Sequence, residues 1–339
     1  MKTYIAETCY GLEDVCREEL KEKLGVSEPK IFEIKGFVEF KNRKLGNYEQ
    51  LKSVYNVYQF LGKVKLTEKK DSLKKIIEFF KNNPPEDLLS AKSFRVSCSR
   101  YGHHEFKSIE VERFVGEYFY ENFHIPVNLE NPDKELFVKI VGSTAYLMLK
   151  LNKISLEKRN YRVFLHPTAA DPILAYGMFR LAKVKEKEIV VDPMCGSGTI
   201  LIESALEFPK ARYFGIDISE KFLKGAKQNA KAAGVDHLIK FIHGDCRNLE
   251  NYFEKIDKII TNPPYGVKMG NEKSVKGLYY KFLESAGKVM KENGRIVLTV
   301  LRGNMFRMAI FRTKFFKIVE ERIVKYGGLF THLFVLEKI

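Results

Sequence analysis

The segment Asn262-Pro263-Pro264-Tyr265-Gly266 carries the most specific chemical signal in this sequence. Proline fixes the backbone, so the side-chain oxygen of Asn262 and the carbonyl oxygen of Pro263 can point into one pocket as acceptors. Two converging acceptors would bind an NH2 group, and Tyr265 could stack on the ring that carries it. The alternative is a plain proline turn with a packed tyrosine, which the position directly after an expected strand disfavours. We therefore assign catalysis to Asn262, Pro263, Pro264 and Tyr265.

A glycine-containing turn, Asp192-Pro193-Met194-Cys195-Gly196-Ser197-Gly198-Thr199, follows another expected strand and opens an expected helix. Its glycines let a ligand approach the backbone, and the N–H groups of a helix N-terminus suit a carboxylate or a phosphate. The pattern is not G-x-G-x-x-G, and Asp192 at the strand tip suits a ligand with a cationic part. The segment therefore predicts a nucleotide-like ligand in preference to a plain strand-to-helix turn.

Two further acids follow the next two expected strands. Asp217 could accept hydrogen bonds from both ribose hydroxyls of an adenosine, or it could cap the following helix, a role that Ser219 could equally fill. Asp245 could accept a hydrogen bond from an adenine amino group. Three acids at successive strand ends predict an adenosine pocket at the carboxyl edge of a parallel sheet. The predicted cofactor-binding residues are Asp192, Cys195, Gly196, Ser197, Gly198, Thr199, Asp217, Ile218, Asp245, Cys246 and Asn262.

Regular alternation of strands and helices from Glu188 onward predicts the sheet that would hold these residues. The expected strands are 189–191, 212–216, 239–243, 258–261, 295–301, 317–324 and 329–336, and the expected helices include 199–207, 220–233 and 275–290. The last two strands are joined by residues 325–328, a connection short enough for a hairpin. A nicotinamide oxidoreductase would instead show G-x-G-x-x-G and a second crossover half, and the sequence shows neither.

The first 150 residues alternate differently and predict smaller α/β units. Strand 3–8, a helix through 12–24 and strand 31–40 form a first unit; helix 72–80, strand 93–98, helix 108–123 and strands 127–129, 136–141 and 145–151 form a second. Thr168 and Asp171 have capping-box spacing ahead of a further helix. We therefore divide the chain into an N-terminal domain 1–60, a second domain 61–155, a linker and capping helix 156–180, and a C-terminal domain 181–339.

The net charge is +15, from 58 Lys and Arg against 43 Asp and Glu, and most of the excess lies in the C-terminal half. Seven basic residues between Leu301 and Lys325 stand against two acids, which favours a polyanionic partner over a merely solvated surface. No apolar stretch reaches the ~18 residues of a membrane span, and the N-terminus resembles no signal peptide. We expect no membrane association.

The five cysteines form no CxxC pair, which favours a reducing cytoplasm over a disulfide framework. His166, His243 and Cys195 have no third ligand at zinc spacing, so we expect no metal site. Cys195 has no matching His and Asp motif, and we do not interpret it as a nucleophile.

The segments 192–199 and 262–266 resemble the motifs of class I S-adenosylmethionine-dependent amino methyltransferases. Residues 93–163 resemble a THUMP domain, an RNA-binding module, in Phe94-Arg95-Val96, in 102–106, in Asn131-Pro132-Asp133 and in 158–162. Together the chain is similar to the THUMP-containing guanine-N2 methyltransferases over nearly its whole length. That family implies an α/β fold with a ferredoxin-like N-terminal domain in 1–60, a THUMP domain in 61–155 and a seven-stranded Rossmann-like sheet ending in an antiparallel hairpin in 181–339.

The resemblance implies methyl transfer from S-adenosylmethionine to the exocyclic N2 of a guanosine in tRNA, with position 6 of the acceptor stem as the expected target. Position 10 of tRNA and ribosomal RNA are alternatives; relatives acting at position 10 often have Asp where this chain has Asn262, and ribosomal relatives share the asparagine. A DNA adenine-N6 methyltransferase would share residues 262–265, and a non-catalytic RNA-binding protein would share 1–163, but neither explains both halves. The exit segment also departs from the family, with Asn160 in place of the usual glycine.

An N2 amine is a weak nucleophile because its lone pair is delocalised into the base. Acceptors at Asn262 and Pro263 would orient that lone pair, so we expect catalysis by positioning, with no strong base. We expect tRNA binding mainly through phosphates, and we expect a monomer. The predicted RNA-binding residues are Arg95, Arg100, His103, His104, Lys107, Arg159 and Arg162.

Overall fold

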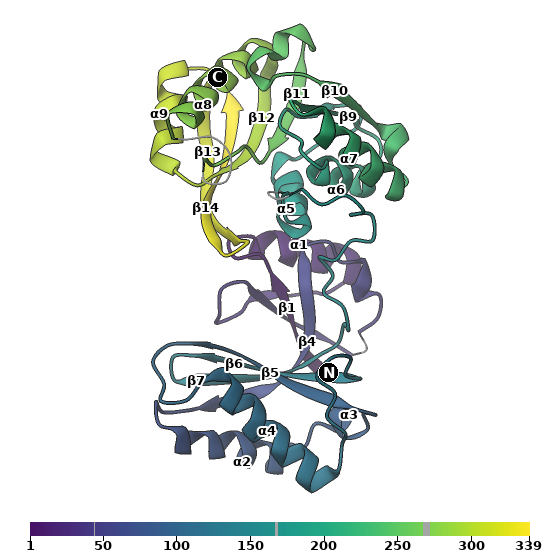
Figure 1. Ribbon diagram of the computed structural model, residues 1–339, viewed down its shortest axis with the longest axis vertical. Coiled ribbons are helices and arrows are strands. Elements are labelled where there is room, and N and C mark those ends of the chain that lie inside the picture. Colours follow the sequence, from purple (N-terminus) through teal and green to yellow (C-terminus); the bar gives the residue numbers. More distant parts are fainter. Residues whose placement is uncertain (44, 167–168, 267–271) are drawn as a thin grey trace. The chain divides into compact units, whose positions relative to one another are not determined.

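A computed structural model describes residues 1–43, 45–166, 169–266 and 272–339 (Figure 1). The chain forms two compact units. The first comprises Met1–Thr8 and Cys16–Leu156, and the second comprises Cys9–Val15 and Glu157–Ile339. Each unit contains one seven-stranded sheet, so the chain is a mixed α/β protein.

The sheet of the first unit has the order β2-β3-β1-β4-β7-β6-β5. Its strands are β1 (Lys2–Thr8), β2 (Lys30–Ile31), β3 (Phe37–Asn42), β4 (Val54–Lys65), β5 (Phe94–Tyr101), β6 (Lys134–Val141) and β7 (Thr144–Lys150). The helices are α1 (Glu13–Leu24), α2 (Lys74–Asn82), α3 (Glu86–Leu89) and α4 (Ser108–Phe123), with short 3-10 helices at Tyr48–Gln50 and Lys70–Leu73. All neighbouring strands are antiparallel except β5 and β6, which are parallel.

Strand β4 is one of the elements of this unit that the sequence analysis missed, as is the short helix α3. Strand β4 pairs with β1 along its first half and with β7 along its second, across a register shift between Phe60 and Gly62. The boundary predicted at residue 60 therefore falls inside one continuous strand. The predicted strand 31–40 is instead two strands separated by a turn at Gly36, and residues 127–129 contribute only an isolated bridge. The predicted helix 108–123 and the pairing of β6 with β7 are confirmed.

The second unit contains a sheet of order β10-β9-β8-β11-β12-β14-β13. Its strands are β8 (Ile189–Asp192), β9 (Arg212–Asp217), β10 (Ile239–His243), β11 (Ile256–Thr261), β12 (Met290–Val300), β13 (Phe316–Tyr326) and β14 (Leu329–Lys338). The first five are parallel, and β14 is antiparallel to both β12 and β13. The predicted seven strands and the final hairpin are confirmed.

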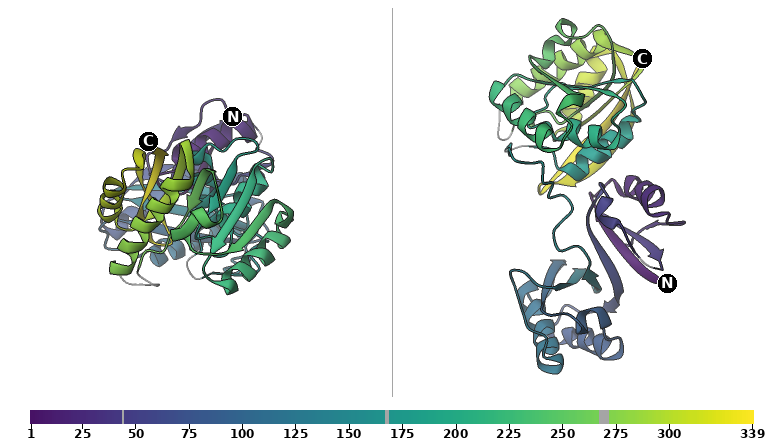
Figure 2. Two further views of the ribbon diagram at one scale, coloured as in Figure 1. Left: turned by 90° about the horizontal axis from the view of Figure 1, so that it is seen from above. Right: turned by 90° about the vertical axis from the view of Figure 1, so that its right-hand side faces the viewer.

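Helices cover both faces of this sheet (Figure 2). They are α5 (Pro172–Ala182), α6 (Thr199–Glu207), α7 (Glu220–Ala232), α8 (Glu272–Val289) and α9 (Gly303–Thr313), with 3-10 helices at Asp236–Leu238 and Cys246–Asn251. Tyr279 and Phe282 of α8 and Phe306 of α9 pack in a core with Ile259 of β11 and Leu298 of β12. Apolar side chains on both faces bury the parallel strands. No helix among the described residues has the length and apolarity needed to cross a membrane.

Helix α5 begins at a cap that differs from the one predicted. Asp171 is itself the N-cap and accepts hydrogen bonds from the backbone N–H groups of Ile173 and Leu174 at 2.8 and 3.3 Å. Pro172 follows at the first helical position, where a missing N–H costs nothing. The predicted capping box gave Asp171 the third helical position instead, and its other member, Thr168, lies outside the described residues.

Candidate functional site

A cavity of about 300 Å³ lies at the carboxyl edge of the second sheet. Because β8 pairs with β9 and β9 with β10 in parallel, Asp192 lies opposite Gly215 and Asp217 lies opposite His243, which brings the predicted strand-end acids to one edge. The predicted residues that line the cavity are Asp192, Cys195, Gly196, Ser197, Thr199, Asp217, Ile218, Asp245, Cys246, Asn262 and Pro264. Gly198, Pro263 and Tyr265 were predicted as site residues but are not part of the lining.

The two glycines of the turn between β8 and α6 have different structural roles. Both have left-handed backbones, with φ of +50° at Gly196 and +78° at Gly198. A Cβ at Gly198 would lie 3.3 Å from the side chain of Ala226, whereas one at Gly196 would come no nearer than 3.8 Å to His166, a cavity-lining residue. Gly198 therefore closes the turn and packs it against α7, and Gly196 leaves its backbone open to the cavity.

Asp192 is the most buried acid of the cavity, with 1% of its surface exposed. Burial raises its pKa to about 7, while a hydrogen bond from the Met194 N–H at 3.2 Å acts in the opposite direction. A carboxyl in this state gains most from a cation placed beside it. The cavity is therefore suited to a ligand with a positively charged group near β8.

Asp217 and Asp245 are both already hydrogen-bonded within the protein. Asp217 accepts from the backbone N–H groups of Gly196 and Ser219, both at 2.9 Å, and each carboxylate oxygen keeps a further lone pair for a hydroxyl group. Asp245 accepts from the backbone N–H and the guanidinium of Arg247, which holds its pKa below the usual range. The acceptor predicted for an adenine amino group is thus already engaged by an arginine.

Asn262 lies at the end of β11, where its side-chain oxygen accepts hydrogen bonds from hydroxyl groups. Tyr265 and Thr299 each approach it at 2.6 Å, and Tyr326 at 3.1 Å. The Tyr265 hydroxyl also lies 2.5 Å from that of Tyr326, and burial raises the pKa of Tyr265 well above its ordinary value. The hydroxyl of Tyr265 therefore points at Asn262 in this structure, and the predicted stacking of its ring on a base stays a prediction.

Several residues of the cavity were missed by the sequence analysis. The His166 ring packs edge-on against Phe222, with ring centroids 4.0 Å apart, and burial lowers the pKa of His166. Ala169 and Ala170, just before α5, line the same side. Small residues directly ahead of a helix cap were the available signal, because they leave room for a ligand. The other missed lining residues are Pro193, Met194, Ile200, Ser219, Gly244, Arg247 and Leu278.

The segment leading into the second unit is fixed to the cavity by buried polar groups. Asn229 of α7 accepts from the Phe164 N–H at 2.8 Å and donates to the Phe164 carbonyl at 2.9 Å and the Ser197 carbonyl at 3.1 Å. Arg159 donates to both carboxylate oxygens of Glu203 at 2.9 and 3.2 Å. The Arg159 side chain is 9% exposed, so its guanidinium is engaged by Glu203 in this structure, and its predicted RNA-binding role stays a prediction.

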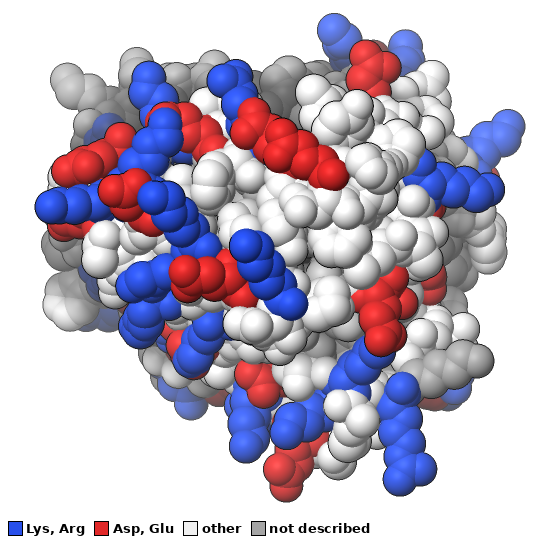
Figure 3. Space-filling model, turned by 90° about the horizontal axis from the view of Figure 1, so that it is seen from below, with Lys and Arg blue, Asp and Glu red and all other residues white. Residues whose placement is uncertain are grey.

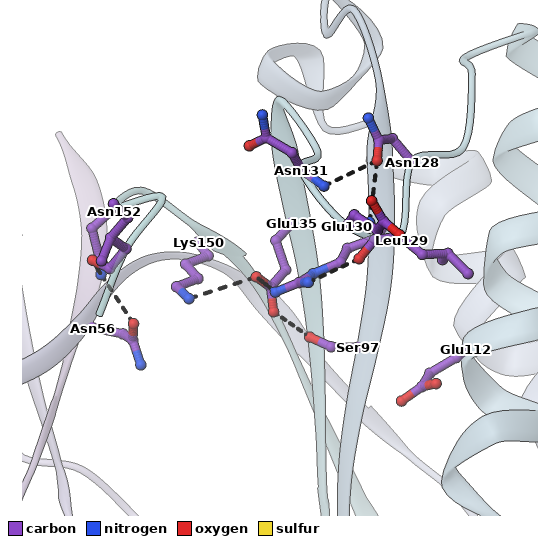
Figure 4. Close-up of polar contacts among 12 residues, drawn as sticks. Asn56, Ser97, Glu112, Asn128, Leu129, Glu130, Asn131, Glu135, Lys150 and Asn152 are labelled. Carbon is purple, nitrogen blue, oxygen red and sulfur yellow. Dashed lines mark hydrogen bonds and ion pairs between the residues drawn. The ribbon is translucent and has the colours of Figure 1, made fainter. Parts of the chain in front are cut away.

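Of the other predicted RNA-binding residues, Arg95 is held by protein acceptors in the first unit. Its guanidinium donates to the Leu129 carbonyl at 3.1 Å and to Glu135 at 2.6 Å. Glu135 also accepts from Ser97 and pairs with Lys150 (Figure 4). These contacts fix the loop before β6 to β5 and β7, so the contacts of Arg95 in this structure are structural.

Arg100 and His104 lie together beside the β6–β7 turn. Arg100 Nη1 lies 3.1 Å from His104 Nδ1, and His104 Nε2 lies 2.8 Å from the Gly142 carbonyl oxygen. His103 and Lys107 are exposed, and Arg162 of the second unit is partly buried. Lysines, arginines and acids are interspersed on the face that carries α2 and α4 (Figure 3). This face therefore shows no large patch made of lysines and arginines alone.

No cluster of three or more metal-ligating side chains occurs among residues 1–43, 45–166, 169–266 and 272–339. Cys195 is buried, and burial raises its pKa well above the ordinary value, which disfavours the thiolate form. Of the basic residues between 301 and 325, Arg307 pairs with Glu321, Arg322 with Glu320 and Lys317 with Glu337. Part of the excess charge predicted to attract a polyanion is thus neutralised within the protein.

The sheet order, the glycine turn and the acids at successive strand ends define a class I methyltransferase unit. The family model described as the RMKL-like methyltransferase domain matches residues 159–332, and the THUMP domain model matches residues 70–150. A protein named tRNA (guanine(6)-N2)-methyltransferase from Thermus thermophilus is 32% identical over 98% of this chain and 99% of its own length.

A protein of the same name from Methanocaldococcus jannaschii is 35% identical over 72% of this chain and 76% of its own length. The crystal structure of TrmN from Thermus thermophilus superposes with a TM-score of 0.87 at 32% identity, covering all of both chains. The chain belongs to the family of THUMP-containing tRNA guanine-N2 methyltransferases.

Proposed function

We propose that this protein transfers a methyl group from S-adenosylmethionine to the exocyclic N2 of a guanosine at position 6 of the tRNA acceptor stem. The observation that carries the proposal is one cavity with Asp192 at one strand end and the acceptor oxygen of Asn262 at another. The position within tRNA is taken from the name shared by two relatives that the chain covers over 99% and 89% of their lengths.

The residues of the cavity fit S-adenosylmethionine. The cavity volume of about 300 Å³ is at the lower end of the range for small-molecule sites. Asp192 suits the cationic amino acid part, Asp217 keeps lone pairs for the ribose hydroxyls, and the exposed side chain of Ile218 offers an apolar surface to a flat ring. The backbone of Gly196 is open to the cavity. When bound, this group supplies a methyl on a sulfonium that is activated for transfer to a nucleophile.

The contribution of the protein to the reaction is to position the amine. The side-chain oxygen of Asn262 and the carbonyl oxygen of Pro263 accept its two hydrogens, which favours a pyramidal nitrogen with its lone pair directed at the methyl group. The nitrogen becomes cationic only as the bond forms, so acceptors already in place stabilise the charge that develops. Its proton leaves afterwards to water, and no strong base is needed.

A guanine in a stem must leave the helix before its N2 can reach Asn262. Extrusion costs a few kcal/mol, and stacking on an aromatic ring is worth about 1–3 kcal/mol per base. Tyr265, once turned away from Asn262, is the ring placed to provide it. The first unit, which contains the THUMP domain, adds affinity mainly through phosphates, so binding should weaken steeply with salt. We further propose that the protein acts as a monomer in the cytoplasm, a reducing compartment that its five free thiols would suit.

The position of the modified guanosine is tested with three unmodified tRNA transcripts: one with guanosine at positions 6 and 10, one lacking it only at position 6, and one lacking it only at position 10. Each is incubated with protein and labelled S-adenosylmethionine. The proposal expects the label to disappear only when position 6 is changed. Loss only with the position 10 change would move the target, and label on ribosomal RNA or DNA alone would remove tRNA as the substrate.

A further inference from the structure

Three hydroxyl groups from three separate elements converge on the side-chain oxygen of Asn262. Thr299 belongs to β12 and is completely buried, Tyr326 ends β13, and Tyr265 lies in the loop after β11. Their oxygens lie 2.6, 3.1 and 2.6 Å from Asn262 Oδ1, and the Tyr265 hydroxyl lies 3.0 Å from that of Thr299. The group predicted to receive the guanine amine is therefore already surrounded by donors.

An amide oxygen has two lone pairs and each hydroxyl has one hydrogen, so two of the three hydroxyls saturate it, and the 2.5 Å contact between the Tyr265 and Tyr326 hydroxyls uses the third hydrogen. A guanine amine can then bond to Asn262 only if one hydroxyl leaves. Thr299 lies in the middle of the sheet, paired through its backbone with Leu333, and Tyr326 is paired with Leu329 across the hairpin. Tyr265 belongs to no strand, so its backbone as well as its side chain can move without breaking the sheet.

We infer that Thr299 and Tyr326 are positioning residues that hold the Asn262 carboxamide toward the cavity, and that the Tyr265 hydroxyl occupies the place of the substrate amine until a guanine enters. The inference rests on the proposed function. Entry of the base exchanges one donor for another at Asn262, so the number of hydrogen bonds that the Asn262 oxygen accepts is conserved. Rotation also releases the ring of Tyr265 for stacking.

Burial raises the pKa of Tyr326 as well as that of Tyr265, so both hydroxyls keep their protons at neutral pH. The hydroxyls of Thr299 and Tyr326, which hold Asn262, and the hydroxyl of Tyr265, which occupies the amine position, should therefore respond differently to removal. Removing a holding hydroxyl should leave Asn262 free to turn away from the amine. Removing the occupying hydroxyl should leave Asn262 better exposed to the amine.

The test compares four variants with the wild-type protein in steady-state formation of N2-methylguanosine on tRNA. Thr299→Val keeps the shape but loses the donor, and we expect kcat to fall about 10-fold or more with KM changed less than about 3-fold. Thr299→Ser should restore kcat to within about 3-fold of wild type, and Tyr326→Phe should lower kcat in the same direction as Thr299→Val. Tyr265→Phe should lower KM at least about 3-fold, because stacking remains and the competing hydroxyl is gone.

Tyr213→Phe is the matched control, because this buried hydroxyl donates to the backbone carbonyls of Ser204 and Phe208 away from the cavity. It should leave both kinetic constants unchanged. A kcat loss in Tyr265→Phe as large as in Thr299→Val would overturn the exchange, and a Thr299→Val enzyme with wild-type kcat would overturn the holding role. If the wild-type protein makes no N2-methylguanosine, the proposed function fails instead.

A second measurement needs no cofactor. A tRNA with 2-aminopurine at the target position keeps the 2-amino group and fluoresces when it leaves the stack. Titration with protein alone should give tighter binding for Tyr265→Phe than for wild type, and weaker binding for Thr299→Val, with equal urea midpoints for the free proteins. Equal dissociation constants for all three would contradict the inference even if turnover changed.

Discussion

Replacing Arg159 by methionine should destabilise the protein rather than weaken its hold on RNA. The Glu203 carboxylate is completely buried, and its partners are the Arg159 guanidinium and the Tyr161 hydroxyl, which donates at 2.7 Å. Removing the guanidinium leaves a buried negative charge with one neutral donor. Breaking a buried ion pair in this way costs about 3–5 kcal/mol.

The Arg159→Met variant should therefore lose about 3–5 kcal/mol of unfolding free energy at pH 7. Urea unfolding at pH 7 measures this loss, and tRNA binding at several salt concentrations measures the electrostatic contribution to binding. Lys158→Ala is the matched control, because Lys158 is an exposed neighbouring cation. The double variant Arg159→Met with Glu203→Gln removes both charges, so it should recover at least half of the lost unfolding free energy. An Arg159→Met protein with wild-type stability but a salt slope lower by about one would refute the reasoning and return Arg159 to the RNA interface.

Three further outcomes are expected. Asn262→Ala should abolish turnover and leave the dissociation constant of S-adenosylmethionine within about 3-fold of wild type. Asp217→Ala should instead weaken S-adenosylmethionine binding at least about 10-fold, as measured by calorimetry. Equal losses of turnover and of cofactor binding in Asn262→Ala would contradict the catalytic assignment of Asn262. Because burial raises the native pKa of Asp192 to about 7, the stability of the free protein should fall as pH rises from about 4 to 7. Cofactor binding should tighten as pH rises through 7. Asp192→Asn should flatten both pH profiles. An added Cβ at Gly225 would lie 2.1 Å from a phenylalanine ring, so Gly225→Ala should cost about 1–3 kcal/mol in urea unfolding, whereas Gly277→Ala, with open space around it, should cost nothing.

The parallel sheet and its edge could be predicted because each strand end carries its own local signal. Asp192, Asp217, Asp245 and Asn262 each follow a short apolar run, and parallel topology then requires those ends to meet. The helix at 108–123 was predictable from its apolar spacing alone. In each case the information lies within one segment of the chain.

The parts that sequence analysis missed depend on distant pairings. Thr299 and Tyr326 lie 37 and 64 residues beyond Asn262, and only the sheet register brings their hydroxyls to it. Strand β4 mixes polar and apolar residues because it pairs with two different neighbours along its length. Arg159 was interpreted as a surface cation because nothing near it in sequence indicates that Glu203, 44 residues away, is its buried partner.

The proposed reaction is methylation of the N2 amine of a guanosine in tRNA at the Asn262 site. The most direct measurement is incubation of the purified protein with unmodified tRNA and labelled S-adenosylmethionine, followed by nuclease digestion and mass spectrometry of the nucleosides. The account predicts label in N2-methylguanosine with the wild-type protein and none with Asn262→Ala. Label in any other nucleoside, or equal N2-methylguanosine from both proteins, would contradict it.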